Sequence, residues 1–145
     1  MSRSKPRLMM ILLMQMLAFG AKACTISATQ LNFASINPIS GNAYNSTATI
    51  TVSCPTTTSF SVALSSGAGT YGQRVMSTGT GTLRYSLFLD PAMTLIWGDG
   101  TVGTSTWNST TGSAGASHTV YGHVPYQPSV APGTYADTIT VTISY

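Results

Sequence analysis

The C-terminal end of the chain alternates strictly between apolar and hydroxyl-bearing side chains. Ile139, Val141, Ile143 and Tyr145 fall on one side of an extended backbone, and the Thr and Ser residues between them fall on the other. This pattern predicts a half-buried strand. Burial of four such side chains is worth roughly 1.5 to 3 kcal/mol each, comparable with the whole stability of a domain at about 5 to 15 kcal/mol. Something must therefore cover this apolar face.

From residue 24 onward, short runs of the same two-residue period are separated by Gly, Pro, Asn and Ser, without a convincing helical period. The predicted strands cover residues 25–33, 48–54, 60–64, 83–89, 119–124 and 135–145, with a possible short extra strand at 95–97. The segment 98–117, rich in Gly, Ser and Thr, is expected to form a surface loop. Six strands and this possible seventh favour an all-β, immunoglobulin-like sandwich of two sheets.

The first 23 residues have the pattern of a signal peptide. Three basic residues precede an apolar run at 8–18, and Ala-Lys-Ala at 21–23 forms a cleavage site. The apolar run is shorter than the about twenty residues that span a bilayer, so no integral membrane segment is expected after cleavage. One domain, residues 24–145, remains. Export implies an oxidising compartment, so Cys24 and Cys54 are expected to form a disulfide, two free thiols being the alternative.

Loss of the leader also changes the charge. The remaining chain has the arginines Arg74 and Arg84 against the aspartates Asp90, Asp99 and Asp137, so its net charge is −1 instead of the +3 of the whole sequence. No basic surface is left that could neutralise a row of phosphates. A nucleic-acid partner is therefore not expected.

Few side chains are suited to catalysis. The two histidines and three aspartates stand in no nucleophile elbow and in no metal-ligand spacing, so neither an enzyme nor a metal or cofactor site is expected. Aromatic residues are the other candidates: Trp97 and Trp107, with Tyr71, Tyr121 and Tyr126, are a possible ligand-contact platform for a carbohydrate or a surface. Packing in the core or anchoring of a loop is the alternative for these rings.

Several strings, taken in their order along the chain, resemble the spore coat protein U domain family. The closing Pro-Gly-Thr-Tyr-Ala-Asp-Thr-Ile-Thr-Val is similar to the most characteristic motif of that family. The strings that carry the resemblance are Cys24, Leu31-Asn32-Phe33 before the Pro38 turn, Thr49 to Cys54, Trp97 to Gly100, Tyr121 to Pro125, and Pro132 to Val141. They extend over the whole predicted mature chain.

The resemblance implies a subunit of an archaic chaperone-usher pilus or a related secreted coat protein. In such pilins the sandwich is incomplete, and a periplasmic chaperone, then a neighbouring subunit, lends the missing strand. Leu31 and Phe33 are expected to form one wall of the acceptor groove and chaperone contact, and Ile139, Val141, Ile143 and Tyr145 the other. The implied partners are the chaperone, an outer-membrane usher and neighbouring subunits. The implied route is from the periplasm to the cell surface or an extracellular fibre, with a role in attachment or biofilm formation.

One feature departs from the polymerising pattern. Shaft subunits of the family carry a donor segment ahead of the first Cys, whereas Cys24 directly follows the predicted cleavage site. An eight-residue strand spans about 26 Å and three residues only about 10 Å, so the chain is expected to accept a strand without donating one. A tip, terminal or accessory position fits this expectation. A self-complete secreted coat protein and a carbohydrate-binding adhesin domain remain as alternatives.

Overall fold

The computed structural model describes residues 23–37 and 40–145, so the predicted signal peptide lies almost wholly outside the described residues. Within them the chain forms eight strands and no helix. The strands are β1 (Thr25–Ala28), β2 (Tyr44–Ser53), β3 (Thr58–Leu64), β4 (Arg74–Ser77), β5 (Thr82–Phe88), β6 (Trp107–Thr111), β7 (Ala116–Val124) and β8 (Val141–Ser144).

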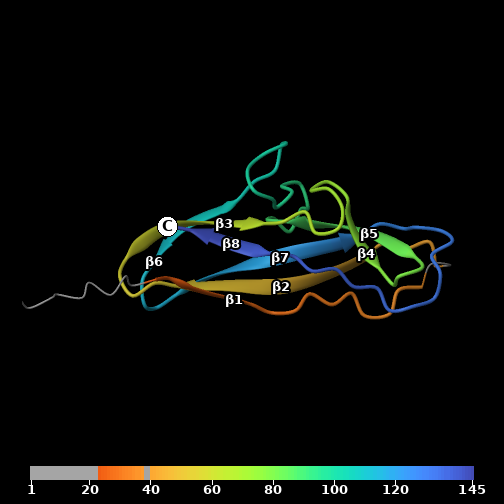
Figure 1. Ribbon diagram of the computed structural model, residues 1–145, viewed down its shortest axis with the longest axis horizontal. Helices are drawn as coiled ribbons and strands as arrows, with labels where there is room; N and C mark the ends of the chain where they lie inside the picture. The colour runs from red at the N-terminus through yellow and green to blue at the C-terminus, as the bar shows by residue number, and fades with distance from the viewer. Residues whose placement is uncertain (1–22, 38–39) are drawn as a thin grey trace, which may run out of the picture.

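These strands form two layers. A five-stranded sheet has the order β1-β2-β7-β5-β4, and a three-stranded sheet has the order β6-β3-β8. Figure 1 shows the three-stranded sheet lying over the larger one in an elongated molecule. The chain changes sheet between β2 and β3, between β3 and β4, and again at each connection from β5 to β8. The predicted all-β sandwich is confirmed.

The core is built by the two-residue period that the sequence shows. In β2 the residues Ala48, Ile50 and Val52 are buried, while the hydroxyl-bearing residues between them are only partly covered. The same alternation in β5 buries Leu83 and Tyr85 and leaves Arg84 exposed. The other buried apolar side chains of the core are Cys54, Phe60, Val62, Leu64, Leu87, Trp97, Trp107, Val120 and Val124.

The predicted disulfide between Cys24 and Cys54 is present. The Sγ atoms are 2.05 Å apart, and the bond joins the residue before β1 to the residue after β2. Among the described strands β1, an edge strand of four residues, pairs only with β2, with Thr25 opposite Ser53. Closing a loop with a sequence separation of 30 restricts the unfolded chain by about 3.5 to 4 kcal/mol in the chain-entropy account. The disulfide therefore holds a short edge strand in place.

Two strands lie where none was predicted. β6 falls inside the segment 98–117 that was expected to be a surface loop, and it pairs with β3 from Val62 to Thr58. Its inward positions are Trp107 and Thr111, and an inward Thr in a polar run gives no apolar period to recognise. β4 begins at the buried Arg74, a residue type that normally marks the exposed face. In both strands an inward polar side chain interrupts the alternation of apolar and polar residues by which a strand is recognised.

Three predicted strands differ most from the observed ones. The segment 95–97 forms only isolated bridges, from Ile96 to Phe88 and from Trp97 to Ser105. The first strand ends at Ala28 rather than at 33, and the last begins at Val141 rather than at 135. Both shortened strands continue as segments that form only isolated backbone hydrogen bonds, and these segments border the candidate site.

Candidate functional site

A groove of about 960 Å³ lies between the two sheets. On one side it is bordered by the segment 29–36, which continues β1, and on the other by residues 137–141, which lead into β8. Its floor consists of inward-facing core residues, including Ile50, Leu87 and Val120. We call this cavity the inter-sheet groove, and it is larger than the cavity of about 550 Å³ beside the turn between β4 and β5.

The first wall is positioned by a glycine of β7. A Cβ atom at Gly122 would lie 2.8 Å from Cζ of Phe33 and 2.9 Å from Cδ1 of Leu31, so both side chains occupy the space that a side chain at 122 would need. The ring of Phe33 also meets Tyr85 edge to face, with centroids 6.2 Å apart. The backbone between the two apolar residues is held by a 2.5 Å hydrogen bond from Ser46 Oγ to the carbonyl of Asn32.

The second wall presents an open strand edge. Ser65 N–H donates to the Thr140 carbonyl at 2.9 Å, and Leu64 is opposite Val141 in the register of β3 and β8. Hydrogen-bonded and non-bonded pairs alternate in an antiparallel ladder, so the N–H and C=O groups of Val141 and Ile143 point away from β3. Among the described residues β8 pairs with no strand except β3. These backbone groups therefore face the open side.

The apolar face of the terminal segment is incompletely covered. Ile139, Val141 and Ile143 are only partly buried, and Tyr145 is 60% exposed, whereas the inward residues of β2 and β3 are buried. The described residues therefore leave this face without the cover that its pattern demands.

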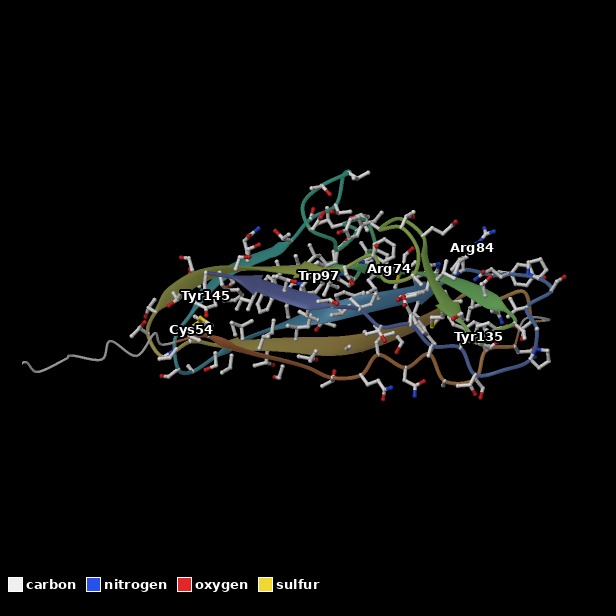
Figure 2. All side chains as sticks on the ribbon, in the orientation of Figure 1. Cys54, Arg74, Arg84, Trp97, Tyr135 and Tyr145 are labelled. Atoms are coloured by element: carbon white, nitrogen blue, oxygen red, sulfur yellow. A yellow bond between two sulfur atoms is a disulfide. The ribbon has the colours of Figure 1, made fainter. Side chains whose placement is uncertain are left out.

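The structure brings together four of the six residues that the sequence assigned to the groove. Leu31, Phe33, Ile139 and Val141 line it, while Ile143 and Tyr145 do not. Ile143 packs against the core further along β8, and Tyr145 lies toward the end of the molecule that carries Cys54 (Figure 2). The alternating run of the sequence continues from Ile139 to Tyr145, but only its first two apolar residues line the groove.

A polar lock fastens the terminal segment where it crosses from one sheet to the other. The Tyr85 hydroxyl donates to Asp137 Oδ2 at 2.6 Å, and Asp137 Oδ1 accepts from the backbone N–H of Ala68 at 3.3 Å. Burial, together with the neighbouring Asp137 carboxylate, raises the pKa of Tyr85 well above its usual value. Ala136 exchanges two backbone hydrogen bonds with Ser77 at the end of β4. Sequence reasoning did not reveal these contacts of Asp137.

Arg74 is a second feature that the sequence did not reveal. Its guanidinium is fully buried and donates to the carbonyls of Ser65 at 2.9 and 3.1 Å, Tyr71 at 3.3 Å and Trp97 at 2.7 Å. Burial lowers its pKa, and the nearby Tyr85, Tyr71 and Asp137 oppose that shift. Figure 2 shows Arg74 and Trp97 side by side in the middle of the molecule. The side chain therefore ties loop carbonyls together, and it is not free to bind a ligand.

The predicted ligand contact through Trp97 and Trp107 does not hold. Trp97 is completely buried and donates its indole N–H to the Val62 carbonyl at 3.0 Å, while Trp107 is 9% exposed. The two rings meet edge to face at 6.4 Å, and His118 stacks on Trp107 at 5.2 Å. A contact platform needs an exposed ring face, so core packing, the alternative, describes both tryptophans.

The other two aspartates, Asp90 and Asp99, serve local structure. Asp90 accepts hydrogen bonds from Leu95 N–H and from Thr94, and these bonds lower its pKa. Asp99 accepts two from Thr101 with the same effect. In the described ranges no three His, Cys, Asp or Glu residues gather as metal ligands. The described residues also contain no helix with the length and apolar character needed to cross a membrane.

Comparison with known proteins agrees with the strings noted in the sequence. The model of the Spore Coat Protein U domain matches residues 11–142. Among solved structures, one match is a chain of the CsuC–CsuE chaperone–tip adhesion subunit pre-assembly complex from the archaic chaperone-usher Csu pili of Acinetobacter baumannii. It is 23% identical with a TM-score of 0.60, and the match covers 86% of this chain but only 40% of that one, so it shows the shared fold. No curated protein matches the chain.

Proposed function

Because the chain belongs to the spore coat protein U domain family, we propose that it is a structural subunit of a chaperone-usher pilus that receives a strand from a partner protein in its inter-sheet groove. The single observation that carries the proposal is an apolar cavity of about 960 Å³ beside the open edge of β8. The solved relative in the fold comparison, a chaperone–subunit complex of such a pilus, supports the same class.

Addition of a strand would both pair the open edge of β8 and cover the apolar face of the groove. An incoming strand finds backbone hydrogen-bonding groups at Val141 and Ile143, and its alternate side chains enter the cavity against Leu31, Phe33 and Ile139. Four apolar side chains buried in this way contribute roughly 6 to 12 kcal/mol before the cost of ordering the strand is subtracted. That is enough to decide whether an otherwise open sandwich is stable.

The partners in this proposal are a periplasmic chaperone, an outer-membrane usher and neighbouring subunits. The signal peptide predicted at 1–23 directs the chain to the periplasm, and the disulfide of the domain at 24–145 suits that oxidising compartment. From there the subunit passes to the cell surface or an extracellular fibre. Its role is in attachment or biofilm formation, at the tip or another terminal position of the fibre.

The test is co-production of the full chain with a matching chaperone in a bacterial periplasm, followed by co-purification. Val141→Asp places a charge on the groove side of β8 and is expected to abolish capture by the chaperone. Thr142→Asp is the matched control, because Thr142 is the next residue, lies in the same strand and is exposed on the opposite face. A stable monomer made without any chaperone, or equal capture of both variants, would contradict the proposal and favour a self-complete secreted coat protein.

A further inference from the structure

A second cavity, of about 550 Å³, lies outside the core beside the turn between β4 and β5. It is bordered by the start of β5 and by the connection that follows β7. Figure 2 shows Arg84 and Tyr135 near the end of the elongated molecule that is opposite Cys54 and Tyr145. The cavity therefore lies away from β8 and the disulfide, and it shares only Val130 and Ala131 with the lining of the inter-sheet groove.

The cavity contains a free cation. The guanidinium of Arg84 is exposed and makes no hydrogen bond or ion pair with any residue in the ranges 23–37 and 40–145. The other arginine there, Arg74, is buried with its donors bound to carbonyls. Asp90, Asp99 and Asp137, the acids of the chain, all lie outside the lining of this cavity. An anion entering it thus meets an unshared positive charge and no carboxylate.

The backbone that carries Arg84 is fixed by Gln127. The Gln127 side-chain amide accepts from Arg84 N–H and donates to the Arg84 carbonyl, both at 2.9 Å, and also donates to the Pro125 carbonyl at 3.3 Å. At the opposite side the Tyr135 hydroxyl donates to the Ala131 carbonyl at 2.7 Å. The connection is therefore attached at both borders of the cavity, which makes the site largely preformed.

Two further features point to a ligand rather than to an empty surface. Tyr126 lines the cavity and is 46% exposed, so an aromatic ring is accessible in the same cavity that Arg84 lines. Ser129, also in the lining, has a φ of 69°, a left-handed conformation that costs a residue other than Gly about 1 to 3 kcal/mol and is concentrated at binding sites. Hydroxyl groups of Thr80 and Thr82 complete the border.

From this set of groups we infer that the Arg84 cavity binds a carboxylated sugar, such as a uronic acid residue of a surface polysaccharide. A guanidinium matches the two oxygens of a carboxylate with parallel hydrogen bonds. An exposed tyrosine ring packs against the apolar face of a sugar, and Ser and Thr hydroxyls bond its hydroxyl groups. The inference does not depend on strand acceptance, so the two can fail independently.

The test compares a galacturonic acid trimer with the neutral galactose trimer, titrated into the full chain in its purified form, alone or with its chaperone. Binding is followed by calorimetry and by NMR shifts of the Arg84 and Tyr126 signals. The acidic trimer is expected to bind saturably at millimolar concentration and the neutral one not. Arg84→Gln is expected to weaken binding about tenfold or more, while Arg84→Lys, which keeps the charge without the planar fork, retains an intermediate affinity.

Two outcomes overturn the inference. The first is no saturable binding of the acidic trimer, or equal binding by Arg84→Gln. The second is competition by inorganic phosphate at the same concentration as the trimer together with unchanged binding by Tyr126→Ala, which means a site for any anion without contact to a sugar ring. Arg84 and Tyr126 are both exposed, so these variants are expected to fold, and an unchanged thermal unfolding temperature checks that they do.

Discussion

The lock between Tyr85 and Asp137 makes a quantitative prediction about how the terminal segment is held. Replacement of Tyr85 by Phe removes only a hydroxyl group, which donates to Asp137 Oδ2 at 2.6 Å. Hydrogen bonds to a charged group contribute about 1.5 to 3 kcal/mol, and the carboxylate left behind keeps the N–H groups of Ala68 and Thr138 as partners. We therefore expect Tyr85→Phe to lower the free energy of unfolding by about 2 kcal/mol. The loss is closer to about 3 kcal/mol if water does not reach the Asp137 carboxylate.

The assay is thermal and urea unfolding of wild type and variant in the same assembly state with the disulfide intact. About 2 kcal/mol corresponds to a fall in melting temperature of about 6 to 10 °C for a domain of this size. Tyr121→Phe is the matched control, since Tyr121 is half-buried on β7 and its hydroxyl makes no hydrogen bond to a described residue. A loss no larger for Tyr85→Phe than for Tyr121→Phe would refute the reasoning.

The same lock predicts a dependence on alkaline pH. The pKa of Tyr85 is raised in the folded state above the ordinary value of 10.0. The unfolded chain therefore loses this proton first, and the contribution of Tyr85, complete below about pH 10, declines as the pH rises further. The difference in unfolding free energy between wild type and Tyr85→Phe should accordingly shrink between pH 9 and pH 11. A difference that stays constant over this interval contradicts the assigned shift.

Two further predictions concern the groove wall and the edge strand. Gly122→Ala inserts a Cβ atom 2.8 Å from the Phe33 ring, so it should displace that wall, destabilise the protein by about 1 to 3 kcal/mol and weaken chaperone capture, whereas Gly72→Ala, with nothing within 4 Å, should change neither. Equal behaviour of the two glycine variants in co-purification would disprove the close packing. Cys54→Ser should cost about 2 to 5 kcal/mol in urea unfolding, and reduction of the wild type should reproduce that loss. If Cys54→Ser were as stable as the oxidised wild type, the disulfide would contribute nothing to the free energy of unfolding.

Strands with an uninterrupted two-residue period were predictable. β2, β3, β5 and β7 all overlap the predicted runs, because most of their inward residues are apolar and many of their outward residues carry hydroxyl groups. The strands that sequence reasoning missed have a polar residue facing inward, Arg74 in β4 and Thr111 in β6. Such residues are buried only because distant carbonyl groups or a neighbouring strand satisfy them, and local sequence does not show those partners.

The candidate site was partly predictable, because some of its residues also follow the two-residue period. Leu31, Phe33, Ile139 and Val141 could be assigned because their spacing marks one face of an extended chain. The limits of the groove could not be assigned, since they depend on where the terminal segment crosses between sheets. That crossing is set by contacts of Asp137 with Tyr85 and of Thr140 with Ser65, which are far apart in the sequence.

The sequence by itself determined the all-β class, the disulfide, and the presence near the C-terminus of an apolar face that requires cover. These follow from local period and from the chemistry of an exported chain, which need no knowledge of distant neighbours. Only the tertiary structure decided that this face stays partly open, that the tryptophans are buried, and that the Arg84 guanidinium has no partner among the described residues. Each of these properties depends on which long-range neighbours fill the space around a side chain. Packing brings those neighbours together from separate parts of the chain.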